Sequence, residues 1–157
     1  MSNAAPNVQP LRLTPAQIDQ IRREGAAAYP NECCGIIYGH DRGGERVVSR
    51  LEAVANVFDE QERYHRFSIS PQQLMTAERE AGERGELVLG FYHSHPDHPA
   101  RPSEYDRQHA WPFYSYVIIA IAKREPGEMT SWQLNEQTES FDAQTLVEAG
   151  AEKTQGR

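Results

Sequence analysis

Two apolar runs and the polar segment between them constrain the fold of this chain more than any other feature. Residues 87–92 and 114–122 are strongly apolar, and each run predicts a buried strand of a sheet. A helix is expected to begin at Ser103, between the two strands, because Glu104 and Asp106 place negative charge in its first turn. Strands and helices that interleave in this way are typical of a domain in which helices flank a sheet.

Two further helices are predicted from one repeated start pattern, at residues 14–17 and 70–73. Each has a capping hydroxyl, a proline at the first helical position and a glutamine three residues after the cap. Pro30 ends the first of these helices and Gly85 the second. The helices are therefore expected to lie before and between the strands.

The remaining strands form hairpins. Residues 33–38 and 46–54 flank a turn-like segment, residues 63–70 form a short strand, and Pro126-Gly127 turns the chain into a last strand at 129–134. The hairpins require a mixed sheet, so the sequence predicts one α/β domain. We expect this domain at residues 11–142, with a disordered tail at 1–10 and a frayed acidic tail at 143–157.

The charge and length of the chain exclude several classes of function. The chain has 157 residues and a net charge of −7, which argues against nucleic-acid binding and against adhesion to an anionic membrane. An uninterrupted apolar run of about 20 residues, which a membrane span needs, is absent from the sequence. The start of the chain lacks the pattern of a secretory signal, and the only cysteines, Cys33 and Cys34, are adjacent. A cytoplasmic protein is expected.

The segment that follows the strand at 87–92 carries the candidate chemistry. His93 and His95 alternate on a strand, so both side chains project to the same face and can share one ion. Asp106 lies one helical turn past a cap and can point back towards a strand end. Two histidines and one carboxylate, with a fourth position open, are the ligands of a catalytic zinc site. Three nearby residues remain open as alternatives to Asp106: Asp97, His98 and His109.

A hydrolytic metal site also needs a base, and Glu32 is a candidate because it lies just before the strand that begins at residue 33. Each of these residues also has an ordinary structural explanation. A histidine pair on a strand is commonly packed or exposed, and Ser103 is expected as a simple helix cap. A glutamate at a strand edge is usually just solvated.

Taken together, these residues resemble the signature of the JAMM (MPN+) metalloprotease family. The pattern is His93-x-His95, seven residues, Ser103, two residues and Asp106, with the distant Glu32. The flanking residues are similar to those of the compact prokaryotic members: Pro-Asn-Glu-Cys-Cys-Gly at 30–35 and Gly-Phe-Tyr-His-Ser-His-Pro at 90–96. The resemblance extends over about residues 13–134.

The resemblance implies a cytidine-deaminase-like fold, with a mixed sheet flanked by helices, and a role for each residue of the pattern. His93, His95 and Asp106 would bind one Zn²⁺, with water as the fourth ligand. Glu32 would activate that water, and Ser103 would hydrogen-bond the oxyanion. The implied activity is hydrolysis of the amide or isopeptide bond after the C-terminal Gly-Gly of a ubiquitin-like protein. Similarity to the small stand-alone members implies a sulfur-carrier partner from which cysteine or a short C-terminal extension is released.

Other interpretations of the same residues remain. A zinc nucleobase deaminase would need His-x-Glu and Cys-x-x-Cys, which the sequence lacks. A cysteine protease would need an exposed thiolate at Cys33 or Cys34, whereas their segment reads as a buried strand. A non-catalytic metal-binding adaptor, or a protein of the RadC-like branch linked to DNA repair, is the principal alternative, and the negative charge argues against DNA binding.

Overall fold

The computed structural model describes residues 8–55 and 69–150 of the chain. Three helices lie in these ranges: α1 (Pro15–Ala28), α3 (Pro71–Glu83) and α4 (Glu104–His109). The strands are β1 (Leu11–Leu13), β2 (Cys34–Arg42), β3 (Glu45–Val54), β4 (Leu87–Pro96), β5 (Ser115–Ala122), β6 (Glu125–Asn135), β7 (Ser140–Gln144) and β8 (Leu146–Glu148). None of the helices in the described ranges has the length and apolarity that crossing a bilayer requires.

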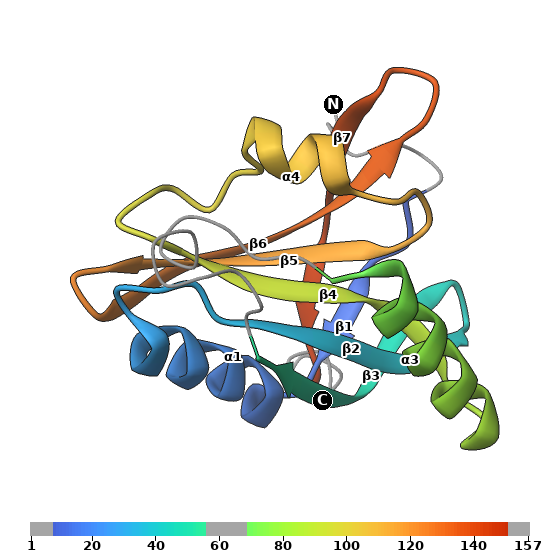
Figure 1. Ribbon diagram of the computed structural model, residues 1–157. Helices are drawn as coiled ribbons and strands as arrows, with labels where there is room; N and C mark the ends of the chain where they lie inside the picture. Colours follow the sequence, from blue (N-terminus) through green and yellow to red (C-terminus); the bar gives the residue numbers. More distant parts are fainter. Residues whose placement is uncertain (1–7, 56–68, 151–157) are drawn as a thin grey trace.

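The strands form one sheet in the order β7-β6-β5-β4-β2-β3-β1-β8 (Figure 1). Strand β4 pairs with β5 in parallel, and β1 pairs in parallel with β3 and with β8. The other neighbouring pairs are antiparallel, including the β2–β3 hairpin. The prediction of a single α/β domain with a mixed sheet is therefore confirmed, and β4 and β2 are its two central strands.

The two longer helices begin where their capping residues predict. The Thr14 hydroxyl accepts a hydrogen bond from the Gln17 N–H at 3.1 Å, while the Gln17 side chain accepts one from the Thr14 N–H at 2.9 Å. Ser70 and Gln73 form the same reciprocal pair at 3.1 and 2.8 Å. Such caps satisfy N–H groups that the first helical turn leaves without partners, and each cap contributes about 1 kcal/mol.

Helices α1 and α3 pack against different faces of the sheet. Ile21 of α1 joins a core cluster that includes Val117, Ile119 and Ile121 of β5, whereas Ala77 and Ala81 of α3 join a cluster that includes Tyr116. Successive residues of a strand point to opposite faces, so the odd-numbered residues of β5 face α1 and Tyr116 faces away from it. The sheet is thus covered on both sides, as an α/β fold requires.

An irregularity in β4 sets the direction of its later side chains. The pairing of β2 with β4 shifts register between Ile37 and Tyr38, because Ile37 faces Gly90 while Tyr38 faces Val88. A side chain at Gly90 is impossible, since a Cβ there would lie 1.9 Å from the carbonyl oxygen of Ser115 on β5. Beyond this bulge, the odd-numbered residues of β4 project to the face opposite α1.

The structure differs from the sequence prediction at both ends of the domain. Residues 143–148 were expected in a frayed tail, but β7 runs to Gln144 and β8 pairs with β1 at the edge of the sheet. The acidic composition of this segment predicts fraying, but its pairing with neighbouring strands offsets the conformational entropy that the segment loses on ordering. At the other end, Gln9 accepts a hydrogen bond from Gln144 and Pro10 accepts one from Arg46. Residues 1–7 and 151–157 lie outside the described ranges.

Two smaller predictions also need comment. Pro126-Gly127 lies within β6, and the chain reverses earlier, at Lys123 and Arg124, which have positive φ angles of 48° and 75°. The proline-glycine pair was therefore wrongly placed at the turn. The short strand expected at 63–70 falls mostly on residues 63–68, which lie outside the described ranges, and Ile69 and Ser70 precede α3 without strand structure.

Candidate active site

Three side chains from β4 and α4 converge on one point. The Nε2 atoms of His93 and His95 lie 3.2 Å apart, and the Asp106 Oδ2 atom lies 3.4 Å from the first and 3.2 Å from the second. Both histidines are buried, with exposed fractions of 1% and 7%. The residues that the HxH spacing and the helix start single out are therefore brought together by the fold.

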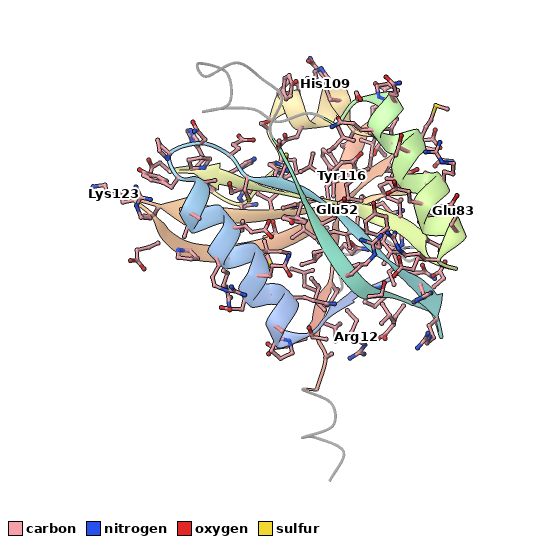
Figure 2. All side chains as sticks on the ribbon, turned by 60° about the horizontal axis from the view of Figure 1, so that its bottom comes forward. Arg12, Glu52, Glu83, His109, Tyr116 and Lys123 are labelled. Atoms are coloured by element: carbon pink, nitrogen blue, oxygen red, sulfur yellow. The ribbon has the colours of Figure 1, made fainter. Side chains whose placement is uncertain are left out.

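The other residues considered as third ligand do not join this cluster. His109 is exposed, its Nδ1 lies 2.9 Å from the Tyr105 carbonyl oxygen and its ring stacks on Tyr105, and Figure 2 shows it at the edge of the molecule. Asp97 accepts hydrogen bonds from the Tyr29 hydroxyl and the Lys123 N–H. His98 is exposed. Among the described residues, only His93, His95 and Asp106 form a cluster of potential metal ligands.

The cap of α4 holds Asp106 in position. Ser103 Oγ accepts a hydrogen bond from the Asp106 N–H at 3.0 Å, and Asp106 Oδ2 accepts one from the Ser103 N–H at 2.8 Å. Burial opposes ionisation of Asp106, but the imidazoles and the Ser103 N–H outweigh it and hold the pKa of the carboxyl well below its usual range. The structural explanation of Ser103 as a cap is therefore correct, and the same cap aims a carboxylate at the two histidines.

The nitrogen atoms that face Asp106 are the Nε2 atoms of both histidines. His95 Nδ1 lies 2.9 Å from the Pro99 carbonyl oxygen, which can only accept, so Nδ1 carries a hydrogen and Nε2 is the nitrogen available to a metal ion. Burial lowers the pKa of His93, which favours the neutral form that binds metals. Two imidazole nitrogens and a carboxylate oxygen in close contact are a donor set that fits a divalent zinc ion.

Glu32 lies beside this cluster although its sequence position is remote. It belongs to the loop between α1 and β2 and is only 7% exposed. A cavity of about 310 Å³ is lined by Glu32 together with His95 and Ser103. Burial, and then the negative charge of Asp106, raise the pKa of the Glu32 carboxyl to about 9. The expectation of a merely solvated glutamate is therefore wrong.

Two sets of hydrogen bonds connect the Glu32 loop to the strand of the histidines. On one side of Glu32, the Cys33 N–H donates to Ser94 Oγ at 2.8 Å, and the Ser94 N–H donates to the Cys33 carbonyl at 3.2 Å. On the other side, the Tyr29 hydroxyl donates to Asp97 Oδ2 at 2.6 Å. Ser94 and Asp97 therefore hold the loop on both sides of Glu32 in place beside the strand that carries His95.

Sequence reasoning missed Ser94 and Tyr29, and it considered Asp97 only as an alternative metal ligand. The alternation of β4 implies that Ser94 points away from the face of the two histidines, but its partner Cys33 depends on the pairing of β2 with β4. Asp97 has a positive φ of 57°, a conformation that favours Asn and Asp among residues other than glycine. An aspartate at this position therefore indicates a turn, but it does not show that Tyr29 is the hydrogen-bond partner of Asp97.

A second, apolar pocket adjoins the cluster. Its wall contains His93 and Asp106 and a group of aromatic side chains from β4, β5, β7 and the α4 region: Phe91, Tyr105, Trp111, Tyr116 and Phe141. Phe141 packs on Tyr116 with ring centroids 5.8 Å apart, so β7 contributes to this wall. The candidate site therefore adjoins a polar cavity and an aromatic pocket with separate linings.

The cysteines do not form a competing nucleophile. Cys34 is buried and Cys33 is half-buried. Burial raises the pKa of each thiol to about 12, and the nearby carboxylates contribute in the same direction. A reactive thiolate needs a lowered pKa, so the burial of both thiols argues against the cysteine-protease interpretation.

Comparison with known proteins gives consistent matches. The family model described as prokaryotic homologs of the JAB domain matches residues 14–135. A desampylase of Haloferax volcanii is 36% identical over 100 residues, which are 62% of this chain and 69% of that protein. A desampylase of Pyrococcus furiosus is 27% identical over 119 residues, or 74% of this chain and 76% of that protein. The solution structure of a Desulfitobacterium hafniense protein superposes with a TM-score of 0.73 at 30% identity and covers 87% of this chain and 91% of that one.

Proposed function

The chain belongs to the JAB/MPN family, in its prokaryotic branch, and on that premise we propose that it is a zinc-dependent peptidase acting on a ubiquitin-like protein. It is a JAMM-type hydrolase. Two of the similar proteins are named desampylases, and together with the JAMM signature this supports a ubiquitin-like substrate. The observation that carries the proposal is the convergence of His93, His95 and Asp106 beside the buried Glu32.

In this proposal His93 Nε2, His95 Nε2 and Asp106 hold one zinc ion. Zinc bound there would supply Lewis-acid chemistry and lower the pKa of water to about 7. The hydrogen bond of His95 to the Pro99 carbonyl fixes the tautomer that zinc binding needs. The cap at Ser103 keeps Asp106 aimed at the two imidazoles, so the ligands are held before any ion arrives.

Glu32 is the proposed general base and acid. It accepts a proton from the attacking water as the water oxygen bonds to the scissile carbonyl carbon. It then delivers this proton to the leaving nitrogen as the C–N bond breaks. Burial and Asp106 raise its pKa to about 9, and a divalent cation among the three ligands opposes both effects. The cation thereby lowers the pKa of the Glu32 carboxyl towards neutral pH, where a group can act efficiently as a general base.

Ser103 is the proposed oxyanion donor. Its Oγ accepts the Asp106 N–H, so the hydroxyl hydrogen remains available to donate towards the polar cavity that Ser103 lines with Glu32. A donor aimed at the developing negative charge stabilises the tetrahedral transition state more than the substrate.

The finer substrate proposal is the bond after a C-terminal Gly-Gly of a sulfur-carrier protein, with cysteine or a short extension released. Two residues without side chains can lie extended close to a protein backbone, which suits a cleft between a strand and a short helix. The net charge of −7 disfavours nucleic acid as partner.

The test is hydrolysis of purified carriers. We expect the zinc-loaded protein to shorten Gly-Gly-tailed ubiquitin-like proteins that bear C-terminal extensions, as detected by intact-mass spectrometry. Chelation of zinc and the substitution Glu32→Gln should both abolish cleavage, while Glu32→Gln retains zinc. Cleavage that persists in Glu32→Gln would remove Glu32 from the base role, and cleavage that survives chelation would refute the metal mechanism.

A further inference from the structure

We propose that the cavity beside Glu32 binds the leaving group through a free carboxylate, which the guanidinium of Arg101 recognises. This inference rests on the proposed function and defines the leaving group more narrowly. The preferred leaving group would be an amino acid or short peptide that carries its own C-terminal carboxylate, rather than the side-chain amine of a lysine.

The position of Glu32 indicates where the leaving group lies. The group that protonates the leaving nitrogen must reach it within hydrogen-bond distance. Glu32 lines the polar cavity with His95 and Ser103, and it is not part of the wall of the aromatic pocket. The leaving nitrogen therefore belongs in the polar cavity.

Arg101 places a positive charge in the same cavity. Its side chain is exposed and forms no ion pair with any residue that the structure describes. Arg101 also lines an adjoining cavity with Glu104, and Glu104 is paired with Arg107. Arg101 is the one arginine or lysine among the described residues that line the cavity, which also contains His98 and Pro99.

The backbone around Arg101 is held against the metal-binding strand. The Arg101 N–H donates to the Pro99 carbonyl at 2.8 Å, and the same carbonyl lies 2.9 Å from His95 Nδ1. The Thr130 hydroxyl donates to the Ala100 carbonyl at 2.6 Å, and Ala100 is fully buried. The segment that carries Arg101 is therefore anchored while its guanidinium remains available to a ligand.

Amine and carboxylate of an amino acid match this arrangement. The two groups are attached to the same carbon atom, so an amine beside Glu32 brings its carboxylate into the cavity that contains Arg101. An arginine fork binds a carboxylate through two parallel charge-assisted hydrogen bonds. The amine of a lysine side chain has no carboxylate within several bonds and would leave Arg101 without a partner.

The experiment compares two matched substrates. One is a ubiquitin-like protein whose Gly-Gly is followed by a single alanine with a free carboxylate, and the other is the same protein with a terminal alaninamide. We expect the zinc-loaded wild-type protein to cleave the first with a kcat/KM about ten- to a hundredfold higher. Arg101→Gln should remove this preference by slowing only the carboxylate substrate, and Arg101→Lys should retain part of it.

Arg22→Gln is the control, because Arg22 is exposed on α1, away from the cavity, and its loss changes the net charge equally. This variant should keep the full preference. Equal cleavage of the two substrates by the wild-type protein would overturn the inference. An equal loss on both substrates in Arg101→Gln would overturn it as well, because Arg101 would then contact a part that both share.

A binding measurement separates this inference from the proposed function. Free L-alanine, titrated into zinc-loaded protein and followed by NMR, should bind more tightly than L-alaninamide, and Arg101→Gln should abolish the difference. Failure to cleave either substrate would refute the proposed function alone. Identical binding of alanine to wild-type protein and Arg101→Gln would refute the carboxylate site even if both substrates are cleaved.

Discussion

Replacing Glu32 by glutamine should stabilise the metal-free protein, and the gain should grow with pH. Burial and the charge of Asp106 raise the pKa of Glu32 from 4.5 to about 9 in the folded protein. Between these values the folded chain binds the proton more tightly than the unfolded chain. The free energy of unfolding of the wild-type protein therefore falls as pH rises through this window. Glutamine has no proton to lose, so the variant escapes this loss.

The magnitude follows from the size of the pKa shift. Each pH unit above the unfolded pKa of 4.5 lowers the stability of the wild-type protein by about 1.4 kcal/mol. By pH 7 the difference between Glu32→Gln and wild type should reach about 3 kcal/mol, whereas at pH 5 it should be below about 1 kcal/mol. Other titrating groups are common to both proteins and largely cancel in this comparison.

Urea unfolding at pH 5, 6, 7 and 8, with a chelator present, measures this difference. Glu83→Gln is the matched control, because Glu83 is exposed at the end of α3, as Figure 2 shows. Its free energy of unfolding should differ from that of the wild-type protein by less than about 0.5 kcal/mol at every pH. Saturating zinc should reduce the difference in unfolding free energy between Glu32→Gln and the wild-type protein, since a nearby cation lowers the pKa of Glu32. A gap that stays constant from pH 5 to pH 8 would refute the reasoning.

Three further substitutions test the separate roles of the site. Asp106→Ala should lose zinc on dialysis, while His109→Ala keeps it; metal analysis showing the reverse would mean that the third ligand is wrongly assigned. Ser103→Ala should lower kcat by about 10²–10³ through loss of the oxyanion donor and cost about 1 kcal/mol of stability through loss of the cap; a stability loss without a rate loss would leave Ser103 a cap alone. Ser94→Ala removes the acceptor of a backbone N–H and should lower the free energy of unfolding by about 1–3 kcal/mol. The variant should retain zinc but have a reduced kcat. An unchanged kcat in the folded fraction would mean that Ser94 contributes only to stability.

Local features of the fold are predictable from neighbouring residues. The caps of α1 and α3 depend on Thr14, Ser70 and the glutamines three residues later, so these starts follow from short patterns. The apolar runs of β4 and β5 follow from composition in the same way. The C-terminal strands were missed because Leu146 and its neighbours have weak strand signals and are held by pairing with Leu11, far away in the chain.

The amino-acid sequence by itself determines the shared direction of His93 and His95, because side chains of a strand alternate. It places Asp106 in the first turn of α4 as one of several candidate ligands, and the structure selects it. Only the tertiary structure brings Glu32 to these ligands. Its place depends on the pairing of β2 with β4 and on the bonds of Ser94 and Asp97 to the loop that carries it. Register between distant strands is decided by the packing of the whole core, which no local pattern contains.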